Sequence, residues 1–345
     1  MVESGMTDRT KEIPRRPRMV ESGVTAQPVV LLRADGGPSI GGGHIVRAGV
    51  LIGAFLKSQC DVHLIAKEDD WTRQALHGCA GKVHFIRRTD NESLIIRKMI
   101  DRLGARLVVL DVGDTSEEYI RYLKESGAPV CTIDDRGRGS ADANATFTAG
   151  LPDRQEKNIY HGLAYAILSP DVQHLRRQPN PNGTPRQSTI FLGTFDPKHY
   201  RRWMPDALRI FPAISFSWFT SESIPPMENL RIYPPDRAAF LSSLASADLV
   251  IVSGGVTLYE TAALGRPAIV LPQSPHEFDQ AALLSEKGAV RMLQDPSAES
   301  LSSAIRALID DPRVIESLSL KASSAVDGRG LERFLDVAMG LMKNI

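Results

Sequence analysis

Short apolar runs alternate with stretches of helical periodicity along this 345-residue chain from Val29 onward. This alternation constrains the fold most, because strands separated by helices pair in parallel and are covered by helices on both faces. The first half has five expected strands, at Val29–Leu32, Asp61–Ile65, Val83–Ile86, Leu107–Leu110 and Pro129–Ile133. Helices are expected between them, at His44–Gln59, Trp71–Gly78, Asn91–Leu103 and Ser116–Glu125. The pattern predicts an α/β fold with a doubly wound parallel sheet.

A break at residues 176–187 divides the chain. This stretch combines three prolines and a glycine with polar side chains and has no periodicity, which is typical of a linker. The second half has four expected strands, at Ser188–Leu192, Ile214–Thr220, Leu249–Val252 and Ala268–Leu271. Its expected helices are Tyr200–Ile210, Phe240–Ser246, Leu258–Leu264, Asp279–Lys287, Ala298–Ile309, Val314–Ser324 and Leu331–Met342.

Two doubly wound domains that face a cleft follow from this division. We assign residues 28–175 to the first and residues 188–345 to the second, with the last helix able to pack back on the first domain. One large α/β domain is the alternative, and the proline-rich break argues against it.

Composition excludes several classes of protein. The 41 basic and 41 acidic residues cancel, so we expect no nucleic acid partner. No apolar run approaches the roughly 20 residues that a membrane helix needs, so no stable membrane insertion is expected. Residues 1–27 are polar and lack the apolar core of a secretory signal. We expect this segment to be disordered and the protein to be cytoplasmic and monomeric.

A glycine-rich loop follows the first expected strand. Five of residues 36–43 are glycine, and a bare backbone lets a ligand approach its amides closely. Gly42 and Gly43 lead into a helix that begins near His44, where free N–H groups and the helix dipole attract an anion. Arg47 lies three residues further on the same helical face. An imidazole and a guanidinium at the carboxyl edge of a parallel sheet predict an enzyme site.

The second half contains a similar strand-to-helix turn. Ser253, Gly254 and Gly255 follow a buried strand, and a helix is expected to begin at Thr257. Backbone amides and two hydroxyl groups there can donate hydrogen bonds to an anion. Glu260, one turn later, can accept two hydrogen bonds from a vicinal diol such as a ribose. The alternative is a first-turn glutamate that complements the helix dipole.

Further polar groups are expected near the same crevice. Gln280 lies in the helix that follows the next buried strand, and Gly193 and Thr194 follow the first strand of the second half. A simple β-turn is the alternative for this last pair. Aspartates also stand at strand ends, but Asp134 and Asp135 are adjacent and would point in opposite directions. We therefore expect neither a metal nor another cofactor.

These motifs together resemble a known group of proteins from about Val29 to the end of the chain. The group comprises the UDP-2,4-diacetamido-2,4,6-trideoxy-beta-L-altropyranose hydrolases of pseudaminic acid biosynthesis and the related spore-coat polysaccharide biosynthesis proteins. The resemblance is carried by the order and spacing of short stretches, which are Arg33–Asp35, Gly43–Arg47, Asp111–Tyr119, Ile133–Asp135, Tyr160–Leu168, Gly193–Pro197 and Ser253–Glu260. The group resembles in turn the peptidoglycan N-acetylglucosaminyltransferase that makes lipid II, which has two Rossmann-like domains in a GT-B fold.

The resemblance implies a GT-B fold with His44 as the catalytic residue and UDP on the second domain. It also implies that Glu260 binds the ribose and that Gln280 lies near the diphosphate or the sugar. Residues 111–113 lack the tyrosine common in the hydrolases, and the Asp-Thr-x-x-x-Tyr pattern of Asp114–Tyr119 fits the spore-coat branch better.

On this basis we expect a hydrolase that cleaves a UDP-linked amino or deoxy sugar at the anomeric carbon. His44 would activate water, the displacement would invert the anomeric centre, and Arg47 would help to neutralise the leaving diphosphate. A glycosyltransferase with the same donor site, in which a hydroxyl group replaces water, is the alternative. A non-catalytic nucleotide-sugar binding protein is the second alternative.

Overall fold

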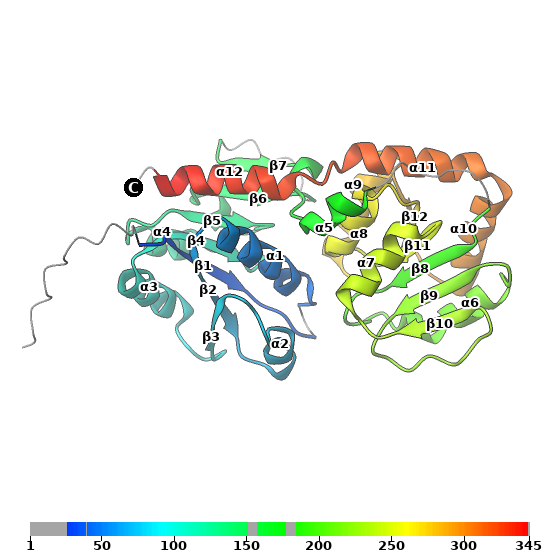
Figure 1. Cartoon of the computed structure of the whole chain (residues 1–345), viewed down its shortest axis with the longest axis horizontal. Helices are drawn as coiled ribbons and strands as arrows, with labels where there is room; N and C mark the ends of the chain where they lie inside the picture. The colour runs from blue at the N-terminus through cyan, green and yellow to red at the C-terminus, as the bar shows by residue number, and fades with distance from the viewer. Residues whose placement is uncertain (1–25, 39, 151–156, 177–183, 344–345) are drawn as a thin grey trace, which may run out of the picture.

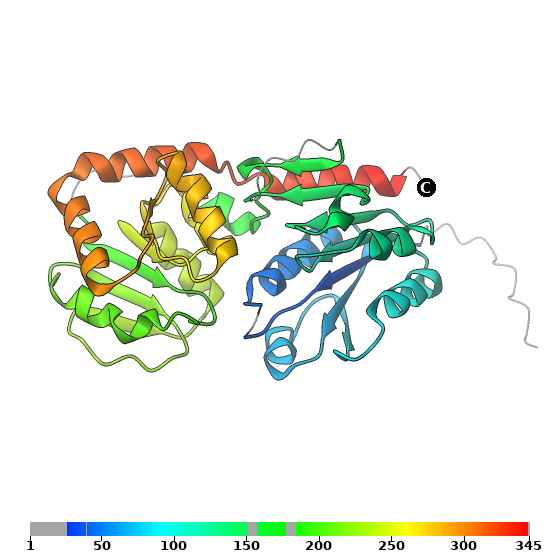
Figure 2. The same cartoon turned by 180° about the vertical axis from the view of Figure 1, so that it is seen from behind.

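The computed structural model describes residues 26–38, 40–150, 157–176 and 184–343. It contains two parallel β-sheets with helices packed on their faces, and the two domains lie side by side (Figures 1 and 2). Nearly all of the expected disordered segment 1–27 and most of the expected linker 176–187 lie outside the described residues. Within the described ranges, no helix combines the length and the apolar character needed to cross a membrane.

The first sheet has seven strands in the order β3-β2-β1-β4-β5-β6-β7. They are β1 (Val29–Ala34), β2 (Asp61–Lys67), β3 (Lys82–Ile86), β4 (Ala105–Asp111), β5 (Val130–Ile133), β6 (Ala145–Thr148) and β7 (Ile159–His161). The helices are α1 (Gly43–Lys57), α2 (Asp70–Ala75), α3 (Glu92–Leu103) and α4 (Glu117–Lys124), with short 3-10 turns at Arg138–Ala141 and Leu163–Tyr165. The chain winds outward from β1 in one direction and from β4 in the other, so a topological switch point lies between these two strands.

The second sheet has six strands in the order β10-β9-β8-β11-β12-β13. They are β8 (Gln187–Phe191), β9 (Ser215–Phe219), β10 (Leu230–Tyr233), β11 (Leu249–Val252), β12 (Ala268–Val270) and β13 (Arg291–Met292). Its helices are α6 (Met204–Arg209), α7 (Arg237–Ser246), α8 (Gly255–Ala263), α9 (Pro275–Glu286), α10 (Ala298–Asp310) and α11 (Pro312–Ala325), with a 3-10 turn at Tyr200–Arg202. The switch point of this sheet lies between β8 and β11.

The alternating pattern predicted the central strands but missed β6, β7, β10 and β13. Three of these are short strands at the edge of a sheet, and β10 has two exposed residues among its four. β6 is buried but contains two threonines. The hydroxyl of Thr146 contacts that of Thr132 at 2.7 Å and the carbonyl of Ser140 at 2.8 Å. Hydrogen bonds thus make a buried strand possible where the apolar pattern is weak.

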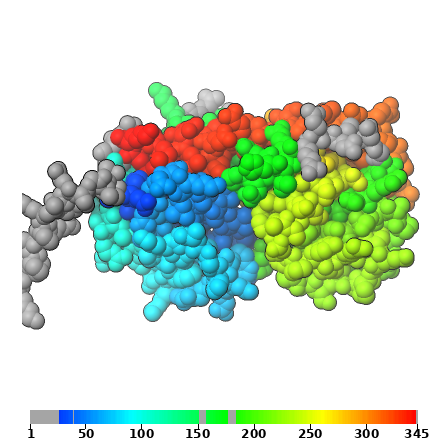
Figure 3. All heavy atoms as spheres, viewed as in Figure 1, coloured from blue at the N-terminus to red at the C-terminus, as the bar shows by residue number. Residues whose placement is uncertain are grey.

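Two helices pack on a different domain from the one to which the sequence analysis assigned their residues. α5 (Pro170–Leu175), which was not predicted, lies within the range assigned to the first domain, yet its Val172 packs in the core formed by α7 and α8. α12 (Gly330–Lys343) returns to the first sheet, where Phe334 packs against Phe55 and Phe147 at ring-centroid distances of 6.1 and 4.8 Å. Figure 3 shows this C-terminal helix covering one side of the first domain. The chain therefore crosses twice between the domains.

Candidate active site

The switch point of the first sheet brings His44 to Asp111. The glycine loop after β1 leads into α1, whose second residue is His44, and the neighbouring strand β4 ends at Asp111. His44 Nδ1 lies 2.6 Å from Asp111 Oδ1. Asp111 is buried, whereas the side chain of His44 retains 21% of its exposure. A neutral imidazole that donates through Nδ1 keeps the lone pair of Nε2 available to accept a proton.

Arg47 fixes the same aspartate from the next turn of α1. Its Nε and Nη2 donate to the two oxygens of Asp111 at 2.7 and 2.6 Å, and Nη1 donates to Asp134 at 2.5 Å. Burial raises the pKa of Asp111, but the charge of Arg47 and the hydrogen bonds from His44 and Arg47 outweigh this effect, so the pKa lies well below its ordinary value. All three guanidinium nitrogens are thus engaged by carboxylates. The predicted contact of Arg47 with the substrate stays a prediction, and in this structure the guanidinium contacts Asp111 and Asp134.

The strand-end aspartates do not gather as metal ligands. Arg47 lies between Asp111 and Asp134 in the place where a cation would balance their charges. Asp135 accepts a hydrogen bond from the backbone amide of Thr115 at 3.0 Å. The chain bends between the two aspartates, since Asp134 has a φ of +49°. In the described ranges, no three histidine, cysteine or acidic side chains are grouped to hold a metal ion.

The switch point of the second sheet brings together Gly193 and Ser253. Gly193 has a φ of +83°, and a Cβ there would lie 3.7 Å from Ser253 Oγ. Ser253 is buried, and its hydroxyl lies 3.4 Å from Glu277 Oε1. A Cβ on Gly254 would come within 2.6 Å of Glu277 Cβ, so glycine is needed where α9 approaches the start of α8.

The first turn of α8 meets the predicted Gln280. Gly255 has a φ of +66°, and its amide donates to Gln280 Oε1 at 2.9 Å. Thr257 is half-buried in the same turn, which contains no acidic residue. The helix therefore supplies no acidic side chain of its own to the positive end of its dipole, and the nearby carboxylate is that of Glu277 on α9.

Glu260 lies deeper in the protein than the sequence suggested. The helix begins at Gly255 rather than Thr257, so Glu260 follows the first turn and does not complement the dipole there. The residue is fully buried and pairs through both carboxylate oxygens with Arg237 on α7, with Arg237 Nη1 at 3.1 Å from Oε2. Arg237 is 40% exposed. The sequence analysis did not identify this arginine.

The loops of the two domains meet at their switch points. A Cβ on Gly42 would lie 2.7 Å from Thr194 Oγ1, and one on Gly43 would lie 3.9 Å from Val256 on α8. The rings of Trp71 and Phe195 also pack across the boundary, with centroids 5.7 Å apart. The predicted residues of the first domain therefore face those of the second.

Three contacting residues at this boundary were missed by sequence reasoning. Tyr259 on α8 is buried, and its hydroxyl lies against Gly150 of the first domain. Arg136, after β5, reaches His276 at the start of α9 with Nη2 2.6 Å from Nδ1. The spacing of glycine and aspartate motifs carries no signal for such contacts, because they depend on how the domains are docked.

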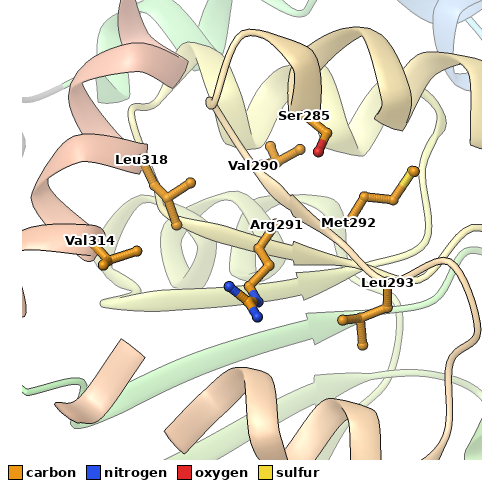
Figure 4. Close-up of a pocket in the computed structure, with 7 residues that line it drawn as sticks. All are labelled: Ser285, Val290, Arg291, Met292, Leu293, Val314 and Leu318. Carbon is orange, nitrogen blue, oxygen red and sulfur yellow. The ribbon is translucent and has the colours of Figure 1, made fainter. Parts of the chain in front are cut away.

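Two pockets differ in their relation to these residues. One of about 340 Å³ lies beside β13 and contains none of the predicted site residues (Figure 4). Most of the side chains that line it are apolar, and Arg291 and Ser285 are the polar ones. A second pocket, at the carboxyl end of β8, is lined by Gly193, Thr194 and their neighbours. Of these two pockets, only the second is lined by residues that the sequence analysis assigned to substrate binding.

The two parallel-sheet domains form a GT-B fold, which confirms the predicted fold class. MurG of Acinetobacter baumannii matches with a TM-score of 0.66 at 16% identity, over 91% of this chain and 99% of that chain. Residues 237–330 match the family model described as the glycosyltransferase family 28 C-terminal domain.

Curated relatives extend this similarity to the sequence. The spore coat polysaccharide biosynthesis protein SpsG of Bacillus subtilis (strain 168) is 23% identical over 342 residues, covering 89% of this chain and 97% of the relative. The UDP-N-acetylglucosamine--N-acetylmuramyl-(pentapeptide) pyrophosphoryl-undecaprenol N-acetylglucosamine transferase of Desulforudis audaxviator (strain MP104C) is 35% identical over 101 residues, which is 27% of each chain.

Proposed function

We propose that this chain is a glycosyltransferase of polysaccharide biosynthesis that moves a sugar from UDP to an acceptor hydroxyl group. The observation that carries the proposal is the His44–Asp111 pair facing the nucleotide-side loops of the second domain. The names of the relatives support it, since one acts in spore coat polysaccharide biosynthesis and another is a transferase of N-acetylglucosamine. These comparisons favour the transferase, which was the alternative of the sequence analysis, over the hydrolase.

In this proposal His44 acts as the general base. Its Nε2 removes the proton from the acceptor hydroxyl group as the oxygen attacks the anomeric carbon. The new bond joins that oxygen to the carbon, the bond from the carbon to the diphosphate oxygen breaks, and UDP leaves with the electron pair. Asp111 remains ionised and stabilises the imidazolium. A single displacement inverts the anomeric centre.

The second domain would hold the nucleotide. The amides of the first turn of α8, with the hydroxyl groups of Ser253 and Thr257, are donors suited to phosphate oxygens. Glu260 would bind the ribose diol. An ionised carboxylate offers about four lone-pair sites, of which Arg237 uses two, so two remain for hydroxyl donors.

Product analysis tests the proposal. The full chain is incubated with a panel of UDP-sugars, with and without glycan and lipid-linked acceptors, and both UDP and the sugar product are measured. We expect UDP release that depends on an acceptor and a product of inverted anomeric configuration. Free sugar released equally fast without an acceptor would replace the transferase with the hydrolase. Binding without any turnover would favour the non-catalytic binding protein.

Replacing Glu260 with alanine should weaken UDP binding by roughly 10–150-fold, because a charge-assisted hydrogen bond contributes about 1.5–3 kcal/mol. Arg237 is partly exposed, so solvent can take the place of its lost partner and the fold should persist. Titration calorimetry with UDP measures the effect. The exposed Glu286 of the same domain provides a matched control, since Glu286→Ala should leave the affinity unchanged. An unaltered affinity in Glu260→Ala would remove Glu260 from the nucleotide site.

Activity should survive chelation. Arg47 already balances the two buried aspartates, and helix N-termini with basic side chains are available for the diphosphate. Turnover measured with EDTA should equal turnover with added Mg²⁺. Reversible loss in EDTA, restored by Mg²⁺ or Mn²⁺, would contradict this and point to a metal held by Asp111 or Asp134.

A further inference from the structure

Three polar side chains meet between the domains without a place in the mechanism above. Arg136 of the first domain approaches His276 of α9, with Nη2 2.6 Å from Nδ1. The other ring nitrogen, Nε2, lies 3.0 Å from Gln280 Nε2. Gln280 in turn accepts the amide of Gly255 through Oε1. The cluster thus joins the loop after β5 to the first turn of α8.

These three contacts cannot all be hydrogen bonds. Arginine and the amide nitrogen of glutamine only donate, and a neutral imidazole has one acceptor nitrogen. If His276 accepts from Arg136, its Nε2–H faces the NH₂ group of Gln280. If the amide of Gln280 is turned, its NH₂ group faces the amide of Gly255 instead. In every arrangement one donor points at another donor, so the cluster has more donors than acceptors.

The surroundings of His276 favour its neutral form. Burial lowers the pKa of His276 most, the charge of Asp134 raises it, and the positive charges of Arg136 and Arg47 lower it. Asp279, on the same helix as His276, accepts a hydrogen bond from Arg136 Nη2 at 3.0 Å and so balances the charge of this arginine. The neutral form of the ring therefore results first from burial, and Arg136 is the cation in direct contact with it.

A second buried donor lies beside this cluster. The hydroxyl of Tyr259 on α8 is fully buried next to Gln280 and forms no hydrogen bond of ordinary geometry with the described residues. A buried polar group left unpaired costs free energy, so such a group indicates a missing partner. The surplus donors, Arg136 and the N-terminus of α8, whose first turn has no acidic residue, together suit a ligand with several anionic oxygens.

We propose that His276 binds the diphosphate of the nucleotide as an imidazolium and takes up one proton from solvent when the ligand enters. The inference rests on the proposed function, because it requires a nucleotide diphosphate at this boundary. The incoming oxygens supply the acceptors that the cluster lacks. Their negative charge reverses the electrostatic preference for a neutral ring. No proton passes to the phosphate in this step.

Calorimetry in buffers of different ionisation enthalpy tests the proposal with UDP-N-acetylglucosamine as the probe. The diphosphate of a nucleotide sugar has no group that titrates near neutral pH, so any proton taken up belongs to the protein. The wild-type chain and His44→Ala should both take up about one proton per ligand near pH 7, whereas His276→Gln should take up none. His44→Ala separates the two histidines and prevents turnover. His77→Gln, at an exposed position of the first domain, is the matched control and should behave as the wild type.

The pH dependence provides a second readout. The affinity of the wild type should rise by up to about tenfold per pH unit as the pH falls from about 8 to about 6, while that of His276→Gln stays level. Three results would overturn the inference while leaving nucleotide binding intact. The wild type could take up no proton, His276→Gln could still take one up, or His44→Ala could fail to do so. Failure of the wild type to bind either UDP or UDP-N-acetylglucosamine would overturn the proposed function and the inference with it.

Discussion

Replacing His44 with alanine is expected to lower turnover by about 10²–10⁴-fold, the usual effect of losing a general base. The affinity for UDP should hardly change, because His44 lies on α1 and the proposed nucleotide contacts lie on α8 and α9. The imidazole touches Asp111 and the neighbouring guanidinium and is partly exposed, so its loss leaves no large cavity. A fall in turnover at constant affinity would therefore reflect chemistry rather than folding.

Steady-state rates and UDP affinity, measured on the same preparations, test this expectation. His77→Ala is a suitable control, since His77 is an exposed histidine of the same domain and should retain full activity. Circular dichroism checks that His44→Ala is folded. If His44→Ala kept more than about a third of the wild-type rate, proton transfer by His44 would make no useful contribution.

The strand and helix pattern was sufficient to predict two doubly wound sheets, because central strands are buried on both faces and are nearly all apolar. β4 and β11 are examples, with almost every residue buried. Short edge strands such as β13, which has two residues and is paired on one side only, leave no such pattern. The return of α12 to the first domain was allowed for in the assignment of the domains, whereas the packing of α5 on the second domain was not. Both helices have an apolar face, and periodicity does not say which domain that face will contact.

The candidate site was predicted only in part for a similar reason. The glycine loop and the start of α1 are local features, so His44 could be identified from sequence. Its partner Asp111 is 67 residues away, and the sequence analysis did not connect it with His44. Their contact depends on β1 lying next to β4, which the order of strands along the chain does not reveal. Arg136 and His276 depend in addition on the docking of the two domains.

Replacing Asp111 with asparagine is expected to reduce turnover as strongly as loss of the base itself, by about 10²–10⁴-fold. An amide cannot stabilise the imidazolium as a carboxylate does, and it can present a donor to Nδ1 and so favour the wrong tautomer. The same change removes one of the two carboxylates that hold the buried Arg47. Breaking a buried ion pair costs about 3–5 kcal/mol, so the unfolding free energy should also fall.

The stability contributed by the ion pair of Asp111 with Arg47 should fall as the pH is lowered. The pKa of Asp111 is lowered in the folded protein, so its contribution is present above the unfolded value of about 3.9 and is lost as the pH falls towards the folded value. The difference in unfolding free energy between the wild type and Asp111→Asn should therefore be largest near neutral pH and shrink below about pH 4. Urea unfolding at several pH values measures it.

Asp134→Asn separates the two roles of Asp111. Asp134 also binds Arg47, at 2.5 Å, but its carboxylate has no hydrogen bond with His44 among the contacts of the described residues. We expect Asp134→Asn to lose stability and to keep a much larger share of the turnover than Asp111→Asn. Equal losses of turnover in the two variants would mean that the aspartates act only by fixing Arg47. The orientation of His44 by Asp111 would then contribute nothing to the rate, and the base would have to be positioned by the helix alone.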